Sequence, residues 1–255
     1  MSGSIKLEKV RFEQILQQAS IFSKAKPLLE PIKLVFKEDG LHVAMSDQSK
    51  TLAVVAHYTP GYFEEYNIGE GEYIVSAYNL VKAMKKVMKG VPFVEVEFKD
   101  DNIIVKGESI TIKDAIRAQE IVNVEKYDEV EGLYVPNKDN VYAIYSVELP
   151  ELASLDFKEV MEFTFGKTIK VLGRMAGTVE ITKDLTIRPL KEPEKEIVGK
   201  YSADYVNRVV KLFKTAGLIA VLATKEEENI VTGPIIIGNK YETYTVSYWI
   251  NSMVA

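Results

Sequence analysis

The chain has 255 residues, of which 37 are acidic and 32 are basic, so its formal net charge is −5. It has no cysteine, which excludes disulfides, thiolate zinc sites and cysteine nucleophiles. With only His42 and His57 present, Ser–His–Asp catalysis and multi-histidine metal sites are poorly supported. We therefore expect an intracellular protein with no membrane span, no catalytic residues, no metal and no cofactor.

Three segments show the apolar spacing of amphipathic helices. Residues 12–19, 80–88 and 206–213 each gather their apolar side chains on one stripe, which predicts a helix with one face against a core. Ser76 and Ser202 stand at the N-cap positions of the second and third helices.

Alternating stretches predict antiparallel strands between these helices. Residues 94–105 and 219–231 each alternate on both sides of a charged turn, which is typical of a hairpin, and residues 177–182 form another alternating strand. The loosest stretch is 118–140, which is acidic and is interrupted by Gly132 and Pro136. We interpret it as a linker between two halves.

The two later helices are related by a constant offset. Ser202 follows Ser76 by 126 positions, and Ala203 and Lys211 follow Ala77 and Lys85 by the same distance. An alternating strand, an acidic turn and a second strand follow each helix. The pattern indicates a two-fold internal repeat of similar α+β domains.

Both repeated helices carry basic residues away from the apolar stripe. A solvated helix face is the ordinary explanation for such residues. Because the cations recur in the repeat while the acidic excess lies in turns and in the linker, a phosphate-contacting face is the alternative. Few aromatic residues lie among the cations. This favours contact with the phosphate backbone of a nucleic-acid duplex over stacking on the bases of a single strand. The residues are Lys82, Lys85, Lys86, Lys89, Arg208, Lys211 and Lys214.

Short motifs in a fixed order extend this reading over nearly the whole chain. They occupy residues 40–52, 60–66, 75–85, 133–136, 201–206 and 233–235. Together they resemble the sliding clamps of the proliferating cell nuclear antigen family: a strand, an Asp-x-Ser turn and a strand, then a Phe-x-x-Tyr stretch, the second helix, the end of the interdomain connector, the last helix and a late strand.

The resemblance implies an α+β clamp fold of two topologically similar domains, with antiparallel sheets and amphipathic helices on one face. The domains would cover residues 1–118 and 139–255, joined by a connector at 119–138. Three chains would close into a ring whose hole is lined by helices. Subunits would pair through edge strands at 109–118 and 177–185, through Ser109, Ile110, Ile112, Ala115, Thr178, Val179 and Ile181.

The resemblance also implies a function without catalysis. A clamp encircles duplex DNA without regard to sequence, is placed there by a clamp loader, and tethers polymerases, nucleases and ligases of replication and repair through short peptide motifs. The family's DNA-facing positions are Lys82, Lys85, Arg208 and Lys211, and helical geometry adds Lys86, Lys89 and Lys214. The implied peptide groove holds Met45, Leu133, Val135, Pro136, Pro234 and Trp249.

Some positions depart from the family pattern. Glu13, Gln14 and Ser20 replace lysines of the first helix, and the short helix expected near 149–155, with Pro150 in its first turn, has no basic residue. Asn251 and Ser252 replace part of the usual chain end, which alters the peptides that the groove accepts.

These departures suit a divergent clamp or one subunit of a hetero-trimer, and a protein-interaction scaffold of the same fold that does not bind DNA is a further alternative. The abundance of Lys, Glu, Ile and Val is compatible with an archaeal hyperthermophile. The clamp would lie with the nucleoid in an archaeal cytoplasm, or in the nucleus of a eukaryote.

Overall fold

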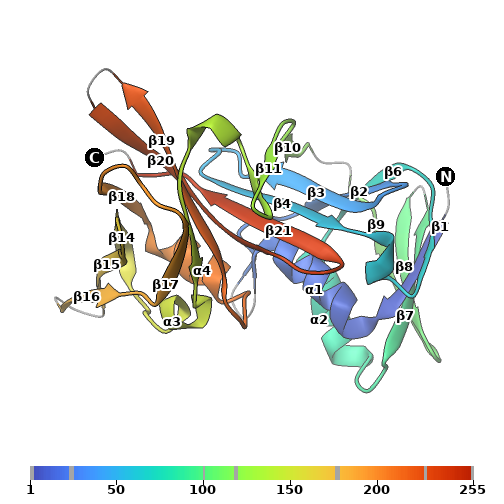
Figure 1. Ribbon diagram of the computed structural model, residues 1–255. Helices are drawn as coiled ribbons and strands as arrows, with labels where there is room; N and C mark the ends of the chain where they lie inside the picture. Colours follow the sequence, from blue (N-terminus) through green and yellow to red (C-terminus); the bar gives the residue numbers. More distant parts are fainter. Residues whose placement is uncertain are drawn as a thin grey trace. The chain divides into compact units, whose positions relative to one another are not determined.

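Alternating burial along the strands builds antiparallel sheets in two separate units. The computed structural model (Figure 1) describes residues 3–22, 26–99, 101–117, 120–175, 179–226 and 229–253. Unit 1 comprises Met1–Asp47, Val54–Val124 and Tyr241–Thr245; unit 2 comprises Gln48–Ala53, Glu125–Lys240 and Val246–Ala255. None of the helices that the structure describes has the length and apolar character needed to cross a membrane.

Unit 1 contains two helices and two sheets. One sheet has the strand order β5-β1-β7-β8-β9, and a second set of paired strands has the order β4-β3-β2-β6 with β10 beside β3. The elements are β1 (Gly3–Glu8), α1 (Lys9–Ser20), β2 (Ile32–Lys37), β3 (Gly40–Ser46), β4 (Leu52–Tyr58), β5 (Glu65–Asn67), β6 (Gly71–Val75), α2 (Ala77–Val87), β7 (Phe93–Lys99), β8 (Asn102–Gly107), β9 (Ile110–Ala115) and β10 (Val122–Asn123), with a 3₁₀ turn at Pro60–Tyr62.

Unit 2 repeats this arrangement. Its sheets have the orders β17-β13-β19-β20-β21 and β16-β15-β14-β18, and a hairpin β11-β12 precedes them. The elements are β11 (Asp128–Val130), β12 (Leu133–Val135), β13 (Val141–Val147), α3 (Leu149–Ala153), β14 (Lys158–Phe165), β15 (Ile169–Arg174), β16 (Glu180–Asp184), β17 (Ile187–Lys191), β18 (Ile197–Ser202), α4 (Ala203–Val210), β19 (Gly217–Glu226), β20 (Asn229–Lys240) and β21 (Tyr244–Ile250), with a 3₁₀ turn at Lys138–Asn140.

The two strand orders are the same once chain position is taken into account. Each strand from β1 to β9 has its counterpart twelve strands later, between β13 and β21, and α1 and α2 correspond to α3 and α4. Helix α2 begins at Ala77 and α4 begins at Ala203, at the offset of 126 positions seen in the sequence. The two-fold repeat of α+β domains is therefore confirmed.

The expected hairpins are also present. In β7-β8, Lys99 pairs with Asn102, and in β19-β20, Glu226 pairs with Asn229. The strand expected at 177–182 begins later, because β16 starts at Glu180; Gly177 and Thr178 lie outside the described residues.

The helices differ from expectation at their ends. The third predicted helix stops at Val210, so Lys211 is its C-cap, and Phe213 is buried beyond it. Ser76 and Ser202 occupy the N-caps of α2 and α4, but neither side chain forms a capping hydrogen bond.

The segment between the halves is not a loose linker. It forms β10, β11 and β12, and Leu133, Tyr134 and Val135 of β12 are all buried. The two units change over between Val124 and Glu125, inside the connector expected at 119–138. Ala118 and Gln119, at the expected start of that connector, lie outside the described residues.

We expect Gly40→Ala to destabilise unit 1. Gly40 has φ +132°, and a Cβ there would lie 2.1 Å from the carbonyl oxygen of Tyr58. Backbone strain and this clash predict a loss of about 3 kcal/mol in the free energy of unfolding, measured by chemical denaturation. Gly69→Ala is the matched control, because a Cβ there meets no atom within 4 Å. Equal stabilities of the two variants would contradict this assignment.

Candidate nucleic-acid interface and peptide-binding surface

Helix α2 presents a row of lysines to solvent. Its apolar stripe, Leu80, Val81 and Met84, is buried, which turns the other face outward. All four predicted lysines are exposed: Lys82, Lys85 and Lys86 lie in the helix, while Lys89 lies just beyond its end. Within the described part of the chain, none of the four takes part in a salt bridge. Their charge is therefore available to an anion.

The corresponding cations at α4 are held by carboxylates. Arg208 Nε lies 2.9 Å from Asp204 Oδ1 one turn earlier. Lys211 Nζ lies 3.3 Å from Asp156 Oδ1. The pKa of Asp156 is lowered mainly by a hydrogen bond from Lys158 and next by one from Lys211, so this carboxylate is charged at neutral pH. Lys214 is exposed beyond the helix end. Asp204 and Asp156 thus offset part of the positive charge at α4.

A single substitution within the repeat accounts for much of this difference. Lys82 and Arg208 are equivalent, and so are the residues one turn before them, Tyr78 and Asp204. The ammonium of Lys82 lies over the Tyr78 ring, 5.8 Å from its centroid. A neutral ring leaves the lysine its full charge, whereas Asp204 compensates that of Arg208.

Helices α1 and α3 add little free positive charge. The side chain of Lys9 is largely buried, 3.5 Å from Glu13, and Arg11 Nε lies 3.7 Å from Glu8. Arg11 also donates a hydrogen bond of 3.0 Å to the carbonyl of Tyr62. Helix α3 has no basic residue, and Pro150 lies in its first turn as expected.

Both strands expected at subunit edges lie at the edge of a sheet. Strand β9 is the last strand of its sheet and pairs with β8. Strand β16 is the last strand of its sheet and pairs with β15. Each therefore has one backbone side that is not used in the sheet that the structure describes.

The two faces of each edge strand differ in polarity. In β9, Ile110 and Ile112 are half-buried on one face, whereas Lys113 is exposed on the other, with Thr111 and Ala115. Ser109 lies in the exposed turn before the strand.

Strand β16 has the same alternation with the opposite charge. Its Ile181 is half-buried, and Glu180 and Asp184 are exposed on the other face. Val179, just before the strand, has 58% of its surface exposed. Thr178 lies outside the described residues.

The residues expected to line the peptide groove divide into buried and accessible ones. Leu133 and Val135 have no exposed surface and belong to the core of unit 2, with Trp249 packed against that core. Pro136, Pro234 and Trp249 are half-buried. Met45 belongs to unit 1, is buried in β3, and pairs through its backbone with Asn123. Leu133, Val135 and Met45 are thus not exposed for a peptide in this conformation.

Two side chains of β21 hold β12 through its backbone. The N–H of Tyr134 donates to Ser247 Oγ at 2.8 Å, and Trp249 Nε1 donates to the carbonyl of Tyr134 at 2.7 Å. Both backbone groups of one connector residue are therefore satisfied by Ser247 and Trp249, two positions on the same face of β21. Sequence reasoning missed this contact because Tyr134 and its partners are more than a hundred residues apart.

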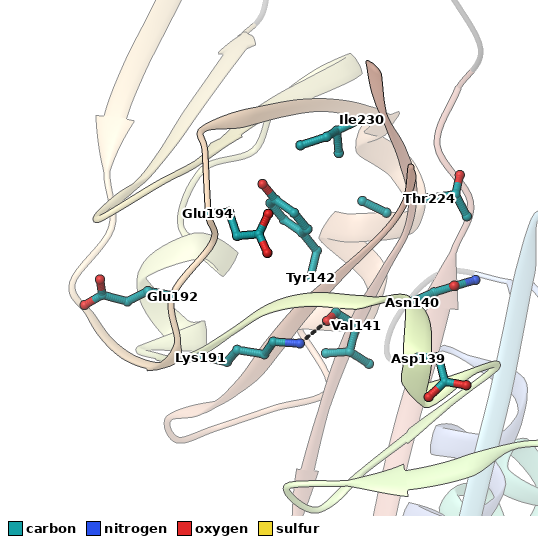
Figure 2. Close-up of a pocket in the computed structure, with 10 residues that line it drawn as sticks. Asp139, Asn140, Val141, Tyr142, Lys191, Glu192, Glu194, Thr224 and Ile230 are labelled. Atoms are coloured by element: carbon teal, nitrogen blue, oxygen red, sulfur yellow. Dashed lines mark hydrogen bonds between the residues drawn. The ribbon is translucent and has the colours of Figure 1, made fainter. Parts of the chain in front are cut away.

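A cavity of about 570 Å³ in unit 2 involves none of the predicted site residues (Figure 2). Lys191 lies at its wall and donates a hydrogen bond to the carbonyl of Val141. Glu192 and Glu194 also line the cavity. The lining also includes Val141 and Ile230, and its described residues show no nucleophile in contact with a base, so we assign it no chemistry.

These observations define a class of fold, the two-domain clamp fold, in which each half contains two antiparallel sheets and a helix pair. No family model matches the sequence, and no curated protein matches it. Solved structures do match over almost the whole chain, and they are structures of proliferating cell nuclear antigen.

The protein of Archaeoglobus fulgidus, bound to the C-terminal region of FEN-1, is 15% identical over 99% of both chains, with a TM-score of 0.74. That of Entamoeba histolytica is 14% identical over 99% of both chains, with a TM-score of 0.73. A PCNA2–PCNA3 complex from Sulfolobus tokodaii is 17% identical over 98% of both chains, with a TM-score of 0.69. The chain therefore has the fold of these proteins.

We expect Trp249→Phe and Ser247→Ala each to release β12. Each removes one of the two bonds to Tyr134 and should lower the free energy of unfolding by about 1–2 kcal/mol. Amide hydrogen exchange at Tyr134 should accelerate in both variants. Tyr142→Phe is the control, because its hydroxyl bonds to Lys195 elsewhere in unit 2. Unchanged exchange at Tyr134 in both variants would show that these bonds do not hold the connector.

Proposed function

We propose that the protein is a DNA sliding clamp: a non-enzymatic, ring-forming subunit that encircles duplex DNA and tethers the enzymes that act on it. The observation that carries the proposal is the repeated strand order, present in both halves of a chain that aligns over its full length with proliferating cell nuclear antigen structures. Such a protein acts through topology, so its contacts with DNA can be weak and independent of sequence.

The internal repeat supports assembly into a ring. Strands β21 and β4 are the counterparts of β9 and β16. Within unit 1, Thr59 N donates to the carbonyl of Thr243 at 2.9 Å, and within unit 2, Asn251 N donates to the carbonyl of Thr51 at 2.9 Å. Thr51 and Thr59 flank β4, and Thr243 and Asn251 flank β21, so the two bonds join the ends of one strand to the ends of the other. By the same logic, β9 of one copy pairs with β16 of the next, and three copies supply the six units of a closed ring.

Complementary charge supports the same pairing. If β9 and β16 pair, Ile110 and Ile112 share a face with Ile181, and Lys113 lies on the face that carries Glu180 and Asp184. The pairing would also remove two open sheet edges, which are otherwise prone to aggregation.

The lysines of α2 are the main proposed contacts with DNA phosphates. Lys82, Lys85, Lys86 and Lys89 are exposed and are free of salt bridges to the described residues. Arg208 and Lys211 are proposed as secondary contacts, because each must leave a carboxylate first, and the exposed Lys214 is proposed beside them. The clamp would act where the cell keeps its DNA.

Peptide-bearing partners are proposed for the connector side of unit 2. The structure from A. fulgidus holds the C-terminal region of FEN-1, a precedent for peptide binding by this fold. Pro136, Pro234 and Trp249 are the accessible residues that we assign to this role, with polymerases, nucleases, ligases and the clamp loader as partners.

A hetero-trimer is the second candidate. Free positive charge is concentrated at α2, while the cations of α1 and α4 are paired, so partner subunits with more basic helices would complete the lining. A PCNA2–PCNA3 complex is a precedent for clamp subunits of different sequence. Light scattering separates the candidates, since a homotrimer has three times the chain mass of 28.7 kDa.

Charge removal at the two repeated helices should have unequal effects. We expect Lys82→Ala/Lys85→Ala to weaken binding to duplex DNA and to lower the slope of log K against log salt by about 1.8 for two lost phosphate contacts. Arg208→Ala/Lys211→Ala, at the equivalent positions, should change the slope less. Fluorescence anisotropy over a series of salt concentrations measures both.

The control is Lys126→Ala/Lys170→Ala, which removes two exposed lysines outside the helices. If all three double variants bind alike, α2 is not the DNA-facing helix. Binding unaffected by any of them would favour a scaffold that does not contact DNA.

Charge reversal tests the subunit edges. We expect Lys113→Glu to dissociate the assembly, because it places like charges together, and Glu180→Lys/Asp184→Lys to restore it in the same chain. Light scattering on a sizing column, at two protein concentrations, reports the mass. Lys126→Glu, at an exposed position outside both edge strands, is the control. A Lys113→Glu protein that keeps the wild-type assembled mass would contradict the proposed edge pairing.

A further inference from the structure

The only two histidines of the chain lie together in unit 1, beside a carboxylate. The rings of His42 and His57 stack with their centroids 4.3 Å apart and their planes at 16°. His42 Nε2 lies 2.8 Å from Asp39 Oδ1, and His57 Nε2 lies 3.8 Å from Asp39 Oδ2. Ligand atoms of all three residues lie within 4.8 Å of one another.

Strand register brings these residues together. His42 lies on β3 and His57 on β4, both half-buried, and Asp39 lies in the exposed turn between β2 and β3. His57 Nε2 also donates to the carbonyl of Asp39 at 2.9 Å, so the turn is held against both rings. Gly40 permits the close approach of the turn to β4, since any Cβ would strike the carbonyl of Tyr58.

Two imidazoles and one carboxylate are ligands that suit Zn²⁺ and similar transition-metal ions of intermediate softness. Zinc binds such ligands at about 2.0–2.2 Å in tetrahedral geometry, which places neighbouring donor atoms about 3.3 Å apart. The two measured separations, 2.8 and 3.8 Å, lie on either side of this value. Because each nitrogen binds a metal in the plane of its ring, one ring must turn out of the stack about its Cβ–Cγ bond to direct both nitrogens to a common point.

We propose that Asp39, His42 and His57 form a binding site for Zn²⁺ or a similar divalent transition metal, with a fourth position open to water or to a donor from a partner. The ion would bind both Nε2 atoms and the carboxylate of Asp39. It would thereby join β3, β4 and the β2–β3 turn. The site shares no residue with α2, the edge strands or the connector, and it does not depend on the proposed clamp function.

The protonation states suit this role. Each Nε2 carries a proton here, because each faces an oxygen that can only accept. Metal binding moves that proton to Nδ1 of the same ring, so a neutral imidazole needs no net ionisation. A neutral imidazole is the form that binds a metal.

Calorimetric titration of the full-length protein with ZnCl₂ tests the proposal. We expect one Zn²⁺ per chain, with affinity reduced by about tenfold or more in each of His42→Gln, His57→Gln and Asp39→Asn. Asp156→Asn removes a carboxylate outside the site and should bind as the wild type does. Because the chain has two histidines and no cysteine, electron paramagnetic resonance of the Cu²⁺ form should show two imidazole nitrogens.

The fold of each variant is checked first by its unfolding curve without metal. Absence of zinc binding in the wild type would overturn the proposal, and so would binding that all three variants retain. Loss of binding confined to variants that also fail to fold is resolved by the copper spectrum of the wild type: two nitrogens support the site, and none overturns it.

Discussion

The backbone of an edge strand, which needs hydrogen-bonding partners, is the constraint on which the rest of this structure depends. Each half of the chain builds the same two sheets and therefore the same two kinds of edge. Backbone hydrogen bonds join the residues that flank β4 to the residues that flank β21. In unit 1 the bond runs from Thr59 to Thr243, and in unit 2 it runs from Asn251 to Thr51. Strands β9 and β16 are the corresponding edges that the chain itself does not pair. In the proposed clamp, assembly of several copies would pair these two edges in the same manner.

The repeat conserves topology more strictly than charge. Tyr78 and Asp204 are equivalent, yet one leaves its lysine charged while the other compensates its arginine. The next pair differs in the same way: Glu30 accepts a hydrogen bond from the N–H of Tyr78 at 3.4 Å, whereas its counterpart Asp156 binds Lys211. Glu30 thus binds the start of α2, whereas the equivalent Asp156 binds a cation at the end of α4. The two helices consequently have different electrostatic roles on the same backbone.

Much of the fold could be predicted because periodicity and the repeat are local signals. The hairpin β7-β8 and the start of α4 at Ala203 follow from alternation and from the match with α2. The end of α4 could not, because Phe213 continues the apolar spacing although it is buried outside the helix.

The contacts of the candidate sites were harder to predict, because most of them join residues that are far apart in the sequence. The ion pair of Arg208 and Asp204 lies one helical turn apart and could be read from the sequence, whereas Lys211 and Asp156 meet through packing alone. His42 and His57 show no metal-binding spacing, and only the register of β3 and β4 brings them together.

The connector was predicted to be a linker, but the burial of β12 shows that it is part of the packed structure. A strand with one face on a core alternates, yet Leu133, Tyr134 and Val135 are all buried, so both faces of β12 are covered. Its central residue is held by the side chains of Ser247 and Trp249 in place of a neighbouring backbone.

A peptide that approaches this part of unit 2 therefore meets half-buried side chains such as Pro136, Pro234 and Trp249, with a fixed core behind them. Because Trp249 donates its only N–H to Tyr134, it can offer a partner its ring surface but no hydrogen bond. In the proposed function, selectivity at Trp249 would therefore come from shape and apolar contact with its ring.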